Sequence, residues 1–133
     1  METINVAVGI IYRTLNDSQQ ILISYRHAHL HQGDLWEFPG GKIENNETLS
    51  EALSRELKEE LGIQVIHQKA LFEINHNYSD KKVCLKICLV EEFTGKATGK
   101  EQQQIKWVGV EDLAGFEFPE ANTPIVEFIR KNL

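Results

Sequence analysis

The sequence predicts an α/β protein in which a mixed β-sheet lies between helices. Several runs are rich in β-branched residues, as the strands of a sheet usually are. One long segment in the middle of the chain and a shorter one at its end place apolar residues at helical spacing instead. Strand and helix patterns mix without strict alternation, so a mixed sheet flanked by helices is the natural arrangement. The 133 residues suit a single domain, residues 1–133.

The first third of the chain predicts strands. Alternating β-branched residues predict strands at 4–12 (INVAVGIIY) and 21–26 (ILISYR), with a turn at 15–20 between them. A polar loop follows, at 27–34. Residues 35–42 (LWEFPGGK) combine two aromatic residues with proline and a glycine pair, which predicts a strand ending in a tight turn.

The strongest helix prediction is 48–62 (TLSEALSRELKEELG). Thr48 and Glu51 have the spacing of a capping box, and Gly62 is a favoured residue at a helix C-terminus. Beyond it, strands are predicted at 70–78, 82–93 and 105–110, with a turn at 79–81 and a glycine-bearing loop at 94–103. The last segment, 118–133, predicts a closing helix, with Pro124 in its first turn.

Charge and composition exclude several functions. The formal net charge is -6 and the pI is about 5.4, which argues against nonspecific binding of duplex nucleic acid but not against a nucleotide ligand. No run approaches the roughly 20 apolar residues of a membrane span, and no segment resembles a signal peptide. Cys84 and Cys88 would lie about 13 Å apart on one strand, too far for a disulfide. Free thiols predict a cytoplasmic location.

Two glutamates of the predicted helix fall where apolar residues are expected. At about 100° per residue, Leu53, Leu57 and Leu61 share one stripe with Glu56 and Glu60, and the next acidic residue, at 59, lies at its edge. Two explanations fit. The stripe is narrow and the carboxylates reach solvent at its rim, or they bind a hard divalent cation such as Mg²⁺ or Mn²⁺, which prefers oxygen ligands.

The residues around this helix match a known motif. The order is Gly41, five residues, Glu47, seven residues, then 55–57 (REL) and 59–63 (EELGI). This resembles the Nudix box, G-x5-E-x7-R-E-U-x-E-E-x-G-U, at every fixed position. The resemblance implies an α/β/α sandwich that hydrolyses a nucleoside diphosphate linked to another group.

The resemblance also implies roles within the box. Glu56, Glu59 and Glu60 would bind Mg²⁺ (or Mn²⁺) together with the carbonyl oxygen of Gly40. Arg55 would orient these glutamates, as Glu47 would near the start of the helix. Catalysis would involve Arg55, Glu56 and Glu59, with Glu56 as the first choice for the group that activates or orients water.

Outside the box, the chain resembles the MutT branch of the same family over nearly its whole length, in VAVGII, EFPGGKIE, GKE and FPEANTPI. This implies nucleotide contacts at Arg26, His31, Glu37, Phe38, Asp80 and Asn122, and a further metal ligand at Glu101. Simpler explanations remain for each: Arg26 as a solvated charge, His31 as an exposed loop residue, Phe38 as core, or Asn122 as a helix N-cap.

The implied reaction is attack of water on the β-phosphorus of an oxidised purine nucleoside triphosphate such as 8-oxo-dGTP. The products would be nucleoside monophosphate and pyrophosphate, and the role would be nucleotide-pool sanitation. Two alternatives are a pyrophosphohydrolase for a pyrimidine triphosphate or nucleotide sugar, and a non-catalytic nucleotide-binding module. We expect a small-molecule nucleotide as substrate, no duplex nucleic acid or membrane partner, and a monomer or weak dimer.

Overall fold

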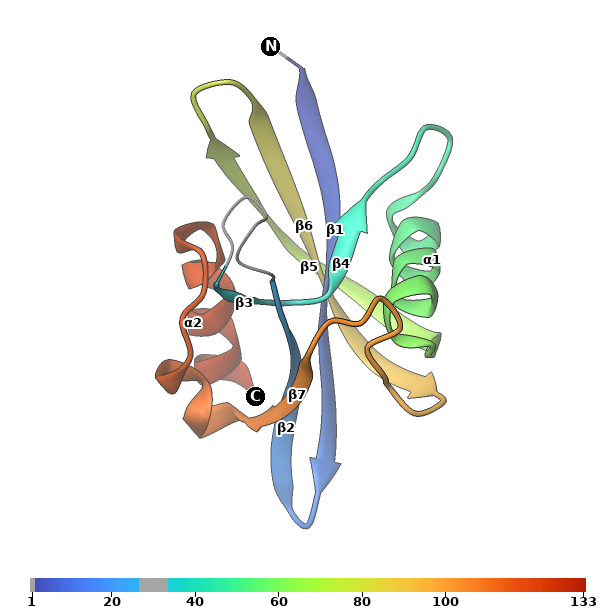
Figure 1. Ribbon diagram of the computed structural model, residues 1–133, viewed down its shortest axis with the longest axis vertical. Coiled ribbons are helices and arrows are strands. Elements are labelled where there is room, and N and C mark those ends of the chain that lie inside the picture. Colours follow the sequence, from blue (N-terminus) through green and yellow to red (C-terminus); the bar gives the residue numbers. More distant parts are fainter. Residues whose placement is uncertain (1, 27–33) are drawn as a thin grey trace.

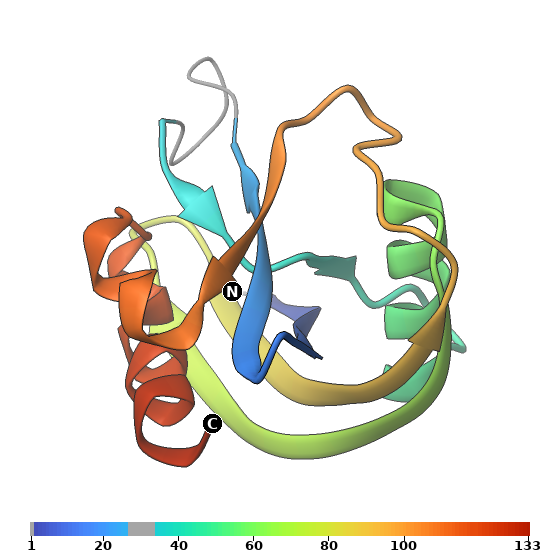
Figure 2. The ribbon, with the colours of Figure 1, turned by 90° about the horizontal axis from the view of Figure 1, so that it is seen from below.

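The fold is that of the predicted class, a mixed sheet between two helices (Figure 1). The computed structural model describes residues 2–26 and 34–133. Helix α1 (Leu49–Leu61) covers one side of the sheet and α2 (Thr123–Asn132) covers the other, as both views show (Figures 1 and 2). Two short 3-10 helices, η1 (Val110–Gly115) and η2 (Glu120–Asn122), lead into α2.

Over the described residues the sheet has seven strands, in the order β3-β2-β1-β6-β5, with β4 paired to β1 and β7 paired to β2. Their bounds are β1 (Thr3–Leu15), β2 (Ser18–Tyr25), β3 (Trp36–Glu37), β4 (Gly40–Lys42), β5 (Gln64–Asn77), β6 (Lys82–Thr94) and β7 (Ile105–Gly109). The β1–β6 pair is parallel, and the other pairs are antiparallel. The sheet is therefore mixed, as predicted.

Strand β1 organises the core because both of its faces are buried. Successive side chains of a strand point to opposite faces. Ala7 and Ile11 join the cluster that packs against α1, and Val8 and Ile10 join the cluster on the α2 side. A central strand buried on both faces is apolar without interruption, which is why residues 6–11 show no polar alternation.

Helix α1 begins and ends as predicted. Thr48 Oγ1 accepts a hydrogen bond from the Glu51 N–H (3.1 Å), and Glu51 Oε1 accepts one from the Thr48 N–H (2.9 Å). Gly62 terminates the helix at φ 73°, a left-handed conformation that glycine adopts without steric cost.

Several details differ from the prediction. The first turn is confined to Asn16 and Asp17, both at positive φ (53° and 65°), so β2 starts at Ser18. Two such residues match the twist of the flanking strands in a tight hairpin. Strand β5 starts at Gln64, two residues after Gly62 and earlier than predicted. Its first residues show no alternating apolar pattern, so the sequence did not reveal this start. The 3-10 helix η1 was not predicted.

The two cysteines are buried free thiols, in agreement with the prediction. No helix within residues 2–26 and 34–133 is long and apolar enough to cross a membrane.

We expect Thr48→Ala to lower the free energy of unfolding by about 1 kcal/mol, because the Glu51 N–H loses its acceptor. Urea denaturation followed by circular dichroism measures this loss. Thr48→Ser is the matched control, since serine keeps the accepting oxygen. Equal destabilisation by the two substitutions would show that the capping box does not stabilise α1.

Candidate active site

A continuous groove crosses one face of the molecule. It consists of three adjoining cavities of about 240, 430 and 200 Å³, and Arg26 and Glu37 line all three. At one end the lining residues include Gly40, Glu56, Glu60 and Glu101. At the other end they include Tyr78, Lys81, Leu85 and Asn122. The groove thus joins an acidic end beside α1 to a mixed polar and apolar end beside η2.

The three glutamates of α1 differ in exposure. The Glu56 side chain is 16% exposed and Glu59 is 54% exposed. Glu60 Oε2 is buried and has no hydrogen-bond partner. Glu56 and Glu60 therefore lie at the inner surface of the helix, as the helical spacing predicts, and Glu59 lies at its rim. An unpaired buried carboxylate oxygen costs free energy unless another group compensates it.

The electrostatics of the acidic end favour a bound cation. Burial raises the pKa of Glu60 to about 8, and the nearby carboxylates of Glu56, Glu101 and Glu37 add to this effect. Burial also raises the pKa of Glu56, although Arg55 acts in the opposite direction. Two carboxyl groups that resist ionisation in one cavity are a feature of functional sites more than of surface charge clusters.

Arg55 donates hydrogen bonds to two of the acidic residues, Glu47 and Glu56. Its Nε and Nη2 donate to the two oxygens of Glu47 (2.6 and 2.9 Å), and its Nη1 donates to Glu56 Oε1 (2.9 Å). Nη2 also donates to the carbonyl oxygen of Lys42 (3.1 Å), and Glu59 Oε2 lies 3.5 Å from Nη1. These bonds lower the pKa of Glu47 to about 2. The bidentate contact with Glu47 holds the Arg55 guanidinium in place. Arg55 therefore orients Glu56, to which it also donates a hydrogen bond.

The glycine pair of β4 lets the backbone reach the carboxylates. A Cβ on Gly41 would collide with the carboxylate of Glu56, and one on Gly40 would collide with the carbonyl oxygen of Ala7. At Gly40 the obstacle is backbone, so no other residue type fits there, whereas a Cβ at Gly41 would have to displace the Glu56 carboxylate. Gly40 also lines the cavity that Glu56 and Glu60 line, so its backbone belongs to the same acidic end.

The donor set fits a hard divalent cation. Its members are oxygen donors: carboxylates, one of them with a buried oxygen that lacks a partner, and a backbone carbonyl. Within residues 2–26 and 34–133, no three acidic, histidine or cysteine side chains are gathered closely enough to form a ready-made metal site. Cation binding would therefore draw these carboxylates together, which their mutual repulsion otherwise opposes.

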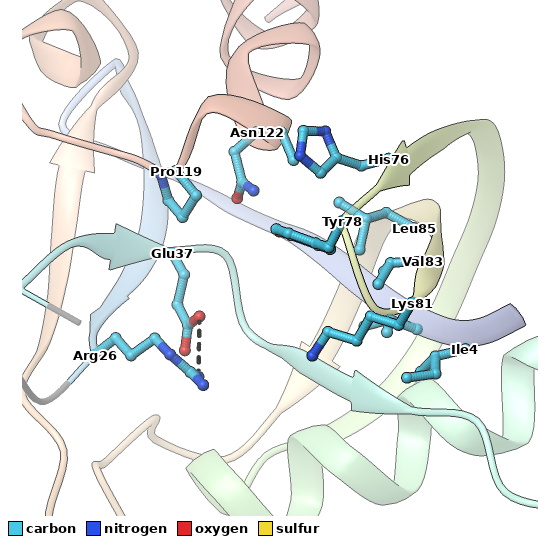
Figure 3. A pocket seen from close by; sticks show the side chains of 12 residues that line it. Ile4, Arg26, Glu37, His76, Tyr78, Lys81, Val83, Leu85, Pro119 and Asn122 are labelled. Atoms are coloured by element: carbon cyan, nitrogen blue, oxygen red, sulfur yellow. Dashed lines mark ion pairs between the residues drawn. The ribbon is translucent and has the colours of Figure 1, made fainter. Parts of the chain in front are cut away.

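The opposite end of the groove offers hydrogen-bonding and aromatic groups. Asn122 points into the cavity and makes no capping hydrogen bond, although it precedes α2 (Figure 3). Phe38 is only 4% exposed and stacks on Phe118 at 4.9 Å, while it also lines the smallest of the three cavities. Phe38 is therefore both core and cavity wall. Arg26 Nη1 lies 3.7 Å from Glu37 Oε2 (Figure 3).

Sequence reasoning missed the side chains of the β5–β6 hairpin. His76, Tyr78 and Lys81 line the cavity opposite Asn122 (Figure 3). The polar hairpin segment was the only available signal. Asp80, which was predicted in their place, is exposed in the turn and is not among the residues that line these three cavities. The predicted contact at His31 lies outside the described residues.

Comparison with known proteins agrees with this geometry. Residues 7–128 match the model of the NUDIX domain. The chain is 37% identical over 131 residues to the 8-oxo-dGTP diphosphatase of Escherichia coli, which covers 98% of this chain and 99% of that protein. It is 33% identical over 127 residues to the CTP pyrophosphohydrolase of the same organism, with coverage of 96% and 91%.

A solved structure is also similar. It comes from work on MutT from Aliivibrio salmonicida and Vibrio cholerae, superimposes with a TM-score of 0.85 and is 38% identical. The alignment covers 99% of this chain and 100% of that one.

Because burial and nearby carboxylates make ionised Glu60 unfavourable, we expect Glu60→Gln to raise the free energy of unfolding of the metal-free protein at pH 8. A carboxyl group whose pKa rises from 4.5 in the unfolded chain to about 8 in the folded chain favours folding fully below pH 4.5. That contribution is lost as the pH rises toward 8, because the folded protein must then carry a buried charge.

In EDTA, the gain in unfolding free energy at pH 8 should be at least about 1 kcal/mol and should shrink at pH 5. Glu59→Gln, at the exposed rim, is the control and should change little. Urea titrations at the two pH values measure both variants. If Glu60→Gln is no more stable than the unmodified protein at pH 8, then burial of the Glu60 carboxylate does not cost stability as inferred.

Proposed function

The chain belongs to the NUDIX domain family, and from that premise we propose that it hydrolyses oxidised purine nucleoside triphosphates such as 8-oxo-dGTP. The products would be the nucleoside monophosphate and pyrophosphate, and the cellular role would be sanitation of the nucleotide pool. The observation that carries this proposal is the continuous groove. It joins the buried carboxylates of a complete motif to Asn122 through adjoining cavities that all share Arg26 and Glu37 as lining residues.

NUDIX hydrolases generally depend on a divalent metal ion, and we propose Mg²⁺ here, with Mn²⁺ as a substitute. The proposed ligands are the carboxylates of Glu56, Glu59, Glu60 and Glu101 and the carbonyl oxygen of Gly40. When bound, the ion would neutralise phosphate charge and make water easier to deprotonate. The raised pKa of Glu60 and its unpartnered oxygen support this assignment.

Glu56 would accept the proton of the attacking water. Its carboxylate lines the cavity, Arg55 donates a hydrogen bond to it, and the missing side chain of Gly41 leaves room for it. The water oxygen bonds to the β-phosphorus, and the bond from that phosphorus to the oxygen bridging toward the α-phosphorus breaks. The departing monophosphate keeps the bridging oxygen. Glu59 is the alternative base, and Arg55 contributes by orienting both.

The other end of the groove would recognise the nucleotide. Arg26 would bind phosphate oxygens, for which a guanidinium is well suited. Asn122 would pair with the purine edge, because an amide both donates and accepts. An 8-oxopurine carries an N–H at position 7 where an ordinary purine has a lone pair, so the Asn122 carbonyl oxygen could distinguish the two. Phe38 and Glu37, which line the groove, complete these contacts, and the contacts at His31 and Asp80 stay predictions from the sequence.

A second candidate is a pyrimidine triphosphate. The 33% identity to a CTP pyrophosphohydrolase and the polar hairpin residues Tyr78 and Lys81 favour it. A non-catalytic nucleotide-binding module is disfavoured, because every fixed position of the motif is present. We further propose one domain, a monomer or weak dimer, and a cytoplasmic location, which the buried free thiols support.

We expect Glu56→Gln to lower kcat by at least about a hundredfold, because the variant loses the group that takes the proton. Steady-state release of pyrophosphate from 8-oxo-dGTP with Mg²⁺ measures the change. The fold should persist, since a repelling charge is removed, and circular dichroism checks this. Glu92→Gln, the same change at an exposed position of β6, should leave turnover intact. Undiminished turnover in Glu56→Gln would contradict the proposed mechanism.

A panel of nucleotides tests the substrate. We expect kcat/KM for 8-oxo-dGTP to exceed that for dGTP, CTP and nucleotide sugars. Asn122→Ala should reduce the ratio of 8-oxo-dGTP to dGTP by about tenfold or more, since one good hydrogen bond to a base edge is worth roughly 1–3 kcal/mol. Equal turnover of dGTP and 8-oxo-dGTP by the unmodified protein would rule out the sanitation role, and preference for CTP would establish the second candidate.

A further inference from the structure

The loop that carries Glu101 is fastened to the C-terminal end of α1. The N–H of Thr98 donates to the carbonyl oxygen of Leu61, and the N–H of Lys100 donates to that of Glu60, both at 3.0 Å. Carbonyl groups in the last turn of a helix have no partner within the helix and must find one elsewhere. The loop between β6 and β7 supplies these partners, which places it beside the acidic end of the groove.

The side chain of Gln103 adds two further bonds at the same place. Its Nε2 donates to the carbonyl oxygen of Glu60 (3.0 Å), and its Oε1 accepts from the N–H of Glu101 (2.9 Å). Only one orientation of the amide satisfies both neighbours. Gln103 also lines the cavity that Glu56, Glu60 and Glu101 line. One side chain thus links the backbone of an α1 glutamate to the backbone of the loop glutamate.

We propose that Gln103 is a positioning residue, which holds Glu101 against the α1 carboxylates so that the four can share one divalent cation. This inference rests on the proposed function, because it takes Glu101 as a ligand of that cation. Gln103 itself would not touch the ion or the nucleotide. It would act through Glu101, as residues that orient metal ligands commonly do.

The loop needs such a tether because its glutamate is repelled from the site. Glu101 is exposed, and its charge contributes to the raised pKa of both Glu56 and Glu60. Without a tether, Coulomb repulsion would drive the loop away from α1. The next residue, Gln102, lies at φ 64°, so the turn itself is held in an uncommon conformation.

An amide suits this position better than other side chains. It is uncharged, so it adds nothing to the crowded negative charge of the cavity, and it provides a donor and an acceptor together. Glutamate would keep the acceptor for the Glu101 N–H but would lose the donor to the Glu60 carbonyl and add a repelling charge. Methionine has nearly the same length and shape but makes neither bond, which makes it the most informative replacement.

The affinity for Mn²⁺ tests the inference without relying on turnover. Free Mn²⁺ is measured by electron paramagnetic resonance in the presence of α,β-methylene dGTP, which cannot be cleaved at the proposed bond. We expect Gln103→Met to weaken Mn²⁺ binding by about tenfold. Gln104→Met is the matched control, because that side chain is exposed, and its affinity should not change. Gln103→Asn, which is too short for both bonds, is the second variant if Gln103→Met folds poorly.

Turnover provides a second readout that a merely structural role would not produce. In Gln103→Met, the Mn²⁺ concentration for half-maximal activity should rise, while kcat at saturating Mn²⁺ should return close to that of the unmodified protein. A loss of kcat that excess Mn²⁺ does not restore would contradict a positioning role toward the cation.

A double-substitution cycle with Glu101→Gln separates this inference from the proposed function. If Gln103 acts through Glu101, the double variant should bind Mn²⁺ no more weakly than Glu101→Gln alone. If Glu101→Gln weakens binding but Gln103→Met does not, or if the two effects add, the positioning role is wrong and the ligand assignment stands. If Glu101→Gln leaves Mn²⁺ affinity unchanged, both the inference and the assignment of Glu101 fail.

Discussion

Burial of carboxylates on the inner surface of α1 is the constraint around which the rest of this molecule is arranged. Leucine at position 60 would extend the apolar stripe and stabilise the helix, yet the chain places there an acid with an unpartnered oxygen. Two features around the neighbouring Glu56 limit the free-energy cost of burying its carboxylate. Arg55 engages Glu56 from the outer side, and Gly41 leaves space for its carboxylate. Such a strained acid supports the proposed cation site, because carboxyl groups with perturbed pKa values cluster at functional sites.

The second organising element is β1, which relates the two ends of the groove. Its pairing with β4 sets Gly40 and Gly41 beside Val8 and Ala7, and therefore beneath α1. Its parallel pairing with β6 carries the β5–β6 hairpin to the other end, where Tyr78 and Lys81 line the same cavity as Asn122. A strand buried on both faces has little freedom to shift, since any change of register would expose apolar side chains.

The sequence predicted what local patterns encode. The capping box, Gly62 and the inner position of Glu56 and Glu60 follow from helical geometry within about 15 neighbouring residues, and the structure has them where expected. The residues that were missed depend on tertiary contacts. Gln103 bonds to Glu60 across 43 positions of the chain, and no spacing rule reports such a contact.

Other positions were ambiguous for similar reasons. Asn122 had two possible roles, as an N-cap or as a group that faces a ligand, and only the side-chain direction separates them. Asp80 was predicted from this hairpin and Tyr78 and Lys81 were not, because a hairpin's sequence does not say which of its residues turn inward. The early start of β5 was missed because an edge strand needs no apolar periodicity when its backbone pairs with β6.

The two ends of the groove are built from different numbers of chain segments. The acidic end comes mostly from one segment, residues 40–60, in which the motif fixes Gly41, Glu56 and Glu60. The other end is assembled from segments near residues 4–6, 76–85 and 119–122, which are far apart in the chain and can change independently. Proteins named for 8-oxo-dGTP and for CTP are both more than 30% identical to this chain. Chemistry carried by a single helix face can stay constant while separate segments alter the base that is accepted. The identity of the base therefore has to be sought in residues such as Tyr78, Lys81 and Asn122 rather than in the motif that identifies the family.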